Sequence, residues 1–168
     1  MTAPSSLKIA LAQLNPVLGD LRGNAKRAAD AHAQAHAAGA DVVVFPELFL
    51  NGYPPEDLVL KPALQDATRV ELERLAAACA EGPAILMGAI WRHADRVFNA
   101  VALLDGGRIE ALTFKAELPN YGVFDEKRVF AAGPMPGPLN VRGVRLGVAI
   151  CEDIWTPEVV ETLAETGA

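Results

Sequence analysis

The chain has 168 residues, of which 51% are apolar, and a formal net charge of −6 at pH 7. This length suits one domain with a sizeable apolar core. The negative charge would repel nucleic acid and anionic membrane surfaces, so we expect neither as a partner. The start of the chain does not resemble a secretory leader, and no apolar run reaches the roughly 18 residues of a membrane span. We therefore expect a cytoplasmic protein. Its two cysteines lack the spacing of a disulfide framework or a zinc site.

The first half of the chain alternates strand and helix patterns. In chain order we expect a strand at 7–14, a helix at 21–38, a strand at 42–45 and a helix at 62–80. Asp20 can cap the first helix and Pro62 can begin the second. Three consecutive strands follow, at 84–91, 97–104 and 108–115. This order predicts a layered α/β fold with helices packed on a mixed sheet.

The second half contains a long loop at 116–130, a proline-rich connector at 133–138 and a short strand at 139–141. The near-continuous apolar run at 144–150 predicts a buried strand that is covered on both faces. It ends on Cys151, and a last helix at 157–166 follows, with Thr156 as its candidate cap.

Three strand ends carry a reactive residue each: Glu47, Lys115 and Cys151. Functional groups collect at such ends in α/β sheets, although each residue alone also fits a purely structural role. If the three converge, the Lys115 ammonium and the backbone N–H groups of the corner would favour a Cys151 thiolate. A desolvated Glu47 could then take the thiol proton and return it to a leaving amine. This set would cleave a carbon–nitrogen bond through a thioester.

Motifs around these residues resemble the three catalytic motifs of the nitrilase, or carbon–nitrogen hydrolase, superfamily. They are Phe-Pro-Glu-Leu at 45–48, Lys-Ala-Glu-Leu-Pro at 115–119 and Cys-Glu-Asp-Ile-Trp at 151–155. Residues 51–58, 118–126 and 151–155 are also similar to the glutaminase domain of bacterial glutamine-dependent NAD synthetases. The resemblance implies an α-β-β-α sandwich. Residues 1–168 would form the N-terminal part of a glutaminase domain, with the sandwich incomplete and the synthetase domain absent.

The resemblance also implies roles for individual residues. Glu47 would be the general base and acid, Cys151 the nucleophile, and Lys115 the stabiliser of the tetrahedral intermediate. The backbone N–H of Glu152 would complete the oxyanion hole, which makes Glu152 a substrate-binding candidate.

Two further residues and several partners follow from the same resemblance. Glu126 matches a second glutamate beside the lysine, and Tyr121 matches a residue near bound glutamine, although local packing explains Tyr121 equally well. The implied substrate is L-glutamine. Its ammonia would pass to a synthetase domain that uses ATP and Mg to amidate deamido-NAD. This domain itself is expected to need no cofactor or metal and to assemble as a homo-oligomer.

Two alternatives remain open for the function. One is a stand-alone nitrilase-type amidase or carbamoylase with the same triad. The other is a catalytically inactive fragment of the domain, and we expect the isolated chain to have little glutaminase activity. His93 offers a Cys–His alternative for Cys151. His32 and His36 have metal-like spacing but no evident third ligand, so a solvated helix face is expected there.

Overall fold

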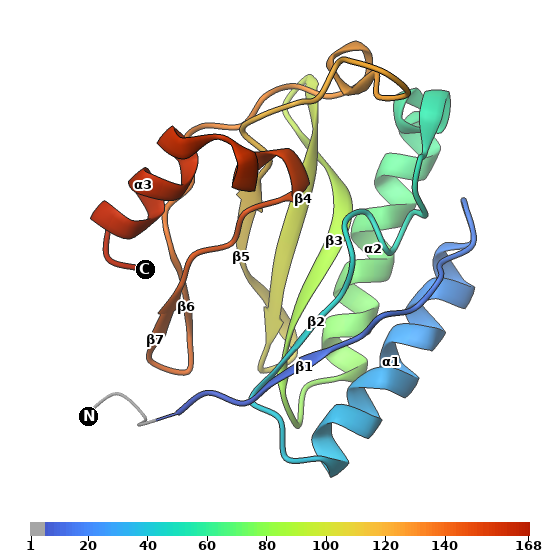
Figure 1. Cartoon of the computed structure of the whole chain (residues 1–168). Coiled ribbons are helices and arrows are strands. Elements are labelled where there is room, and N and C mark those ends of the chain that lie inside the picture. Colours follow the sequence, from blue (N-terminus) through green and yellow to red (C-terminus); the bar gives the residue numbers. More distant parts are fainter. Residues whose placement is uncertain (1–5) are drawn as a thin grey trace.

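The structure is a computed structural model that describes residues 6–168 (Figure 1). Its helices are α1 (Leu21–Ala37), α2 (Pro62–Ala78) and α3 (Pro157–Glu165). Its strands are β1 (Ile9–Leu11), β2 (Val42–Val44), β3 (Ala84–His93), β4 (Arg96–Asp105), β5 (Arg108–Phe114), β6 (Leu139–Val141) and β7 (Val144–Leu146). Three short 3₁₀ turns complete it: η1 (Glu56–Leu60), η2 (Glu126–Arg128) and η3 (Cys151–Trp155). Within residues 6–168, no helix is both long and apolar enough to cross a bilayer.

The main sheet has five strands in the order β1-β2-β3-β4-β5. Strands β1, β2 and β3 run parallel, whereas β3, β4 and β5 are joined by antiparallel pairing. Two reversals bring β5 back to the direction of β2. The carboxyl ends of β2 and β5 therefore lie at the same edge of the sheet, which places Glu47 and Lys115 near each other.

Each face of this sheet has its own core. Helices α1 and α2 cover one face, and their small side chains, such as Ala28 and Ala76, pack on buried residues including Ile85 and Met87. The β6–β7 hairpin lies on the other face, against Val42 and other buried side chains of β2, β3 and β4. Figure 1 shows α3 beyond that hairpin, on the side away from α1 and α2. The chain is thus layered as the sequence predicts.

The predicted buried strand at 144–150 is wrong in extent and in burial. Strand β7 ends at Leu146, pairs only with β6, and is half-buried, while Gly147 is exposed. The reason is its partner: Leu146 pairs with Leu139, the first residue of β6. The connector before Leu139 contains three prolines, which cannot donate ladder hydrogen bonds. Within the described chain, residues 147–150 are held by packing of Val148 and Ile150 and by a hydrogen bond from the Ile150 N–H to Asp153, and not by a sheet.

The helix predictions are confirmed to within two residues at their ends. Asp20 caps α1 by accepting a hydrogen bond from the Gly23 N–H at 3.0 Å. Thr156 occupies the N-cap position of α3, but its side chain makes no capping hydrogen bond. The η3 turn between Cys151 and α3 was not predicted.

Candidate active site

Glu47 lies where the chain leaves β2 and crosses over β3. Gly88 of β3 permits this crossing, because a Cβ there would lie 2.3 Å from the Pro46 carbonyl oxygen and 2.5 Å from the Leu48 nitrogen. Leu48 has a left-handed backbone with φ of 51°, which costs free energy for a residue other than glycine. Its completely buried side chain holds the turn in place. The Glu47 side chain is thereby fixed at the carboxyl edge of the sheet.

Lys115 follows β5 and is completely buried, with a side-chain exposure of 0%. Its Nζ donates to Glu47 Oε1 at 2.7 Å, and to Glu126 Oε1 and Oε2 at 3.0 and 2.9 Å. Glu126 reaches it from η2 and is itself buried. One ammonium is therefore shared by two carboxylates from different parts of the chain.

The charges of this cluster influence one another strongly. Burial alone would lower the pKa of Lys115, but its hydrogen bonds and charge interactions with Glu47 and Glu126 raise the pKa above its usual value. Burial raises the pKa of Glu126, and Lys115 offsets only part of that shift. Lys115 therefore stays protonated. Burying the Glu126 carboxylate therefore costs desolvation free energy that Lys115 does not fully offset.

Cys151 begins the η3 turn, also with a left-handed backbone (φ 48°), and is exposed to solvent on one side. Its side chain lines the same small hollow as Glu47. Partial burial and the Glu47 charge raise the pKa of the thiol, while Lys115 lowers it by less. This direction does not favour the resting thiolate that the sequence suggests. A protonated thiol needs a base during any attack, and Glu47 is the carboxylate that shares its hollow.

Asp153 links the segment that follows Lys115 to the segment that precedes Cys151. Its carboxylate is 1% exposed, and Oδ1 accepts from the N–H groups of Ala116 and Glu117 at 3.0 and 2.8 Å. Its Oδ2 accepts from the N–H of Ile150 at 3.0 Å. The residues just after Lys115 and just before the nucleophile are thus held by a single side chain.

The profile of a family described as Carbon-nitrogen hydrolase matches residues 8–168. The chain belongs to this carbon–nitrogen hydrolase family. The cluster of Glu47, Lys115 and Cys151 therefore lies in a chain of the family that the motifs indicate, and the layered fold is that of its solved members.

Curated relatives of this carbon–nitrogen hydrolase chain include two glutamine-dependent NAD(+) synthetases. The protein of Rhodobacter capsulatus is 45% identical over 161 residues, which is 96% of this chain and 29% of that protein. The protein of Thermotoga maritima is 45% identical over 152 residues, or 90% of this chain and 26% of that protein. The chain spans less than a third of the length of either relative.

Solved structures show the same fold. The glutamine-dependent NAD+ synthetase of Acinetobacter baumannii superposes with a TM-score of 0.85 at 34% identity, over 95% of this chain and 30% of that chain. An amidase of the nitrilase superfamily from Nesterenkonia superposes with a TM-score of 0.80 at 29% identity, over 98% of this chain and 64% of that chain. The predicted nitrilase-like fold is confirmed, and this carbon–nitrogen hydrolase chain covers only part of either neighbour.

Tyr121 and Glu152 form a hydrogen-bonded pair next to Cys151. The Tyr121 hydroxyl donates to Glu152 Oε2 at 2.8 Å, and 59% of Tyr121 is exposed. This hydrogen bond raises the pKa of the Tyr121 phenol. The ring also meets Phe124 edge-on, with centroids 5.7 Å apart. Tyr121 thus has a packing contact and a free polar surface near Cys151.

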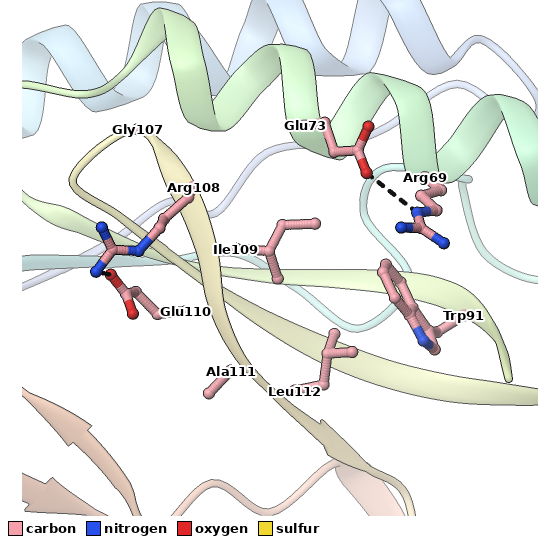
Figure 2. A pocket seen from close by; sticks show the side chains of 9 residues that line it. All are labelled: Arg69, Glu73, Trp91, Gly107, Arg108, Ile109, Glu110, Ala111 and Leu112. Atoms are coloured by element: carbon pink, nitrogen blue, oxygen red, sulfur yellow. Dashed lines mark hydrogen bonds and ion pairs between the residues drawn. The ribbon is translucent and has the colours of Figure 1, made fainter.

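Two hollows in the surface differ in chemistry. A small one of about 120 Å³ is lined by Glu47 and Cys151 together with apolar residues of β2, β3 and β4. A larger groove of about 480 Å³ lies between α2 and β5, and Figure 2 shows its lining. That groove carries two ion pairs, Arg69–Glu73 and Arg108–Glu110, and none of the predicted site residues. The small hollow is therefore the candidate active site.

The histidines take no part in this cluster. His93 ends β3 and is exposed, and it does not line the small hollow that contains Cys151. His32 is buried, contrary to expectation, with Nε2 3.0 Å from the Pro83 carbonyl oxygen, whereas His36 is exposed. In the described part of the chain, no group of three candidate metal ligands occurs.

Sequence reasoning missed three residues that contact the cluster. Asp153 belongs to the motif at 151–155, but the motif does not indicate its role. The Tyr53 hydroxyl lies 3.4 Å from Glu126 Oε1, and burial together with nearby negative charge raises the pKa of Tyr53. Asn99 of β4 donates from Nδ2 to Glu47 Oε1 at 2.7 Å. Tyr53 belongs to the motif at 51–58, but that motif does not show its partner, which lies 73 residues away. Nothing local in the sequence marks Asn99, whose partner lies 52 residues away.

Proposed function

We propose that this chain carries the catalytic centre of a glutamine-hydrolysing enzyme that supplies ammonia for NAD synthesis. The observation that carries this proposal is that Glu47 binds the Lys115 ammonium and lines the same small hollow as Cys151. Glu47 and Cys151 line one hollow of a carbon–nitrogen hydrolase chain, and the buried Lys115 ammonium is paired with Glu47 behind it. A base, a nucleophile and a cation are the groups that amide hydrolysis through a thioester requires.

In the first half of the reaction, the Cys151 sulfur attacks the side-chain amide carbon of L-glutamine and Glu47 takes the thiol proton. The carbonyl oxygen becomes an oxyanion, which Lys115 and the Glu152 N–H stabilise. Glu47 then gives its proton to the amide nitrogen. The carbon–nitrogen bond breaks, ammonia leaves, and a γ-glutamyl thioester remains on Cys151.

In the second half, water attacks the thioester carbon while Glu47 takes a proton from that water. The second tetrahedral intermediate collapses by breaking the carbon–sulfur bond, glutamate leaves, and Glu47 returns the proton to the sulfur. Glu126 holds the Lys115 ammonium toward the oxyanion throughout. The raised pKa of the Cys151 thiol supports this scheme, because a protonated nucleophile needs a base at each step.

Substrate choice is attributed to the exposed Tyr121–Glu152 pair. A tyrosine hydroxyl and a carboxylate suit the ammonium group of a free amino acid. The relatives named as glutamine-dependent NAD(+) synthetases support glutamine in particular. In the longer enzyme, the ammonia would pass to a synthetase domain, and ATP and Mg would belong to that domain.

Protection of Cys151 tests the substrate without requiring turnover. The rate at which iodoacetamide alkylates Cys151 is measured by peptide mass spectrometry in the presence of L-glutamine, D-glutamine, propionamide or an N-carbamoyl amino acid. We expect L-glutamine alone to slow the alkylation. Protection by propionamide or the carbamoyl compound would support a stand-alone amidase or carbamoylase. No protection by any compound would support an inactive fragment. Cys79 serves as the internal control, because it lies at the end of α2 away from this cluster.

A further inference from the structure

Asn99 lies in the middle of β4, paired with Ile90 of β3, and is 1% exposed. Its backbone carbonyl accepts from the Lys115 N–H at 2.9 Å, and its side-chain Nδ2 donates to Glu47 Oε1 at 2.7 Å. One residue of a rigid central strand therefore holds both the backbone of the lysine and the carboxylate of the glutamate.

The side-chain orientation of Asn99 is determined by its neighbours. Its Oδ1 is buried and has no hydrogen-bond partner among residues 6–168. Turning the amide over would give Oδ1 no better surroundings, because two acceptor oxygens would then face each other at the 2.7 Å contact with Glu47. An unpaired buried carbonyl destabilises the fold, so an apolar residue would suit this strand position better. The hydrogen bond that Asn99 Nδ2 donates to Glu47 therefore explains why an asparagine occupies this position.

Glu47 Oε1 has two hydrogen-bond donors. That oxygen receives hydrogen bonds from both Lys115 Nζ and Asn99 Nδ2, each at 2.7 Å. We propose that Asn99 is a positioning residue, which holds Oε1 of Glu47 so that Oε2 is left to take the proton of the Cys151 thiol. This inference rests on the proposed function, since it assigns Glu47 the role of base. It adds a residue that none of the catalytic motifs contains.

The amide also affects the charge of the cluster. The groups that face Glu47 are Lys115 from β5, Glu126 from η2, Cys151 from η3 and Tyr53 from the loop before η1. Asn99 opposes the raised pKa of Glu126 by stabilising its charged form.

Two near-isosteric variants test the proposal through the pH dependence of Cys151 alkylation by iodoacetamide. The quantity compared is the midpoint, which is the pH at which the alkylation rate reaches half of its maximum. Asn99→Leu removes both the Nδ2 donor and the unpaired Oδ1 acceptor. We expect it to move this midpoint upward by about one pH unit, because alkylation then depends on the thiolate alone, and to leave the melting temperature unchanged or higher. Asn99→Asp adds a like charge and should move the midpoint further upward.

The matched control is Asn24→Leu. Asn24 is another fully buried asparagine, but it pairs with the carbonyls of Val17 and Leu50 near the start of α1. We expect this variant to lower the melting temperature without moving the midpoint. If Asn99→Leu leaves the midpoint in place, the proposal is overturned, whether or not L-glutamine protects Cys151. If Asn99→Leu does not fold, NMR of the unchanged chain decides. The Asn99 side-chain amide signal must then shift with pH at the same midpoint as the alkylation rate, and a signal that does not shift refutes the proposal.

Discussion

Lys115 is the residue on which the charge balance of the site depends. Its buried ammonium lies between Glu47 and Glu126, and without it two carboxylates would share one cavity with no cation among the side chains that contact them. Breaking a buried ion pair is far more costly than replacing the whole set, because the remaining charge stays buried and unpaired.

We therefore predict that Lys115→Met lowers the free energy of unfolding by about 3–5 kcal/mol. Adding Glu126→Gln should recover part of that loss, since it removes one of the two uncompensated carboxylates. Urea denaturation of the two variants measures both effects. Lys61→Met is the control, because Lys61 is exposed at the start of α2, and no measurable change is expected there. Equal destabilisation of the single and double variants would contradict this account.

Position in the sequence singles out candidate site residues where they stand at a strand end, whereas Glu126 in η2 is marked only by the motif resemblance. Glu47, Lys115 and Cys151 each follow a strand or an apolar run, so their positions mark them. Asn99 stands in the middle of a buried strand, where a polar residue has no local explanation. The role of Asn99 depends on its hydrogen bond to Glu47, which forms only in the folded chain.

At the scale of elements, the relative positions of Glu47, Lys115 and Cys151 depend on links between the chain segments that carry them. Asp153 supplies a direct link, since its carboxylate accepts from N–H groups beside Lys115 and beside Cys151. Removing an acceptor from a buried donor costs about 1–3 kcal/mol. A looser link would also let the thiol and the base separate.

We predict that Asp153→Asn destabilises the chain by about 1–3 kcal/mol, because its amide NH₂ would face a backbone N–H that now donates to an oxygen. Alkylation of Cys151 near neutral pH should slow in the same variant. Asp105→Asn is the matched control: Asp105 also accepts from a backbone N–H, that of Gly106, but in an exposed turn. A much smaller change is expected there. Unchanged stability and alkylation in Asp153→Asn would show that this link is not needed.

The predictable elements are those whose pattern reflects their own burial. Helices α1 and α2 and the strands β3, β4 and β5 follow from periodicity and turn residues. The run at 147–150 has the same apolar pattern as a strand, but no strand within residues 6–168 pairs with it. Pairing between distant segments cannot be read from the pattern of one of them.

At the scale of the whole molecule, the outer edge of the sheet is incompletely covered. Strand β1 is an edge strand of the described sheet, and Ile9 and Leu11 are 49% and 71% exposed. The fold of the Nesterenkonia amidase extends beyond the part that this chain matches, since the chain covers 64% of it. An apolar edge without cover favours pairing with another chain.

We predict that this chain, studied by itself, self-associates as its concentration rises and binds a dye that reports exposed apolar surface. Leu11→Lys should weaken both effects, because a charged side chain on an edge strand opposes pairing between chains. The alkylation rate of Cys151 should stay the same, since Leu11 lies outside the small hollow. Sedimentation velocity and dye fluorescence measure the outcome. Val70→Lys is the control, because Val70 is 53% exposed on α2 and not on a sheet edge, so no change is expected. A chain that stays monomeric and does not increase the dye fluorescence at any concentration would contradict the prediction that the β1 edge pairs with another chain.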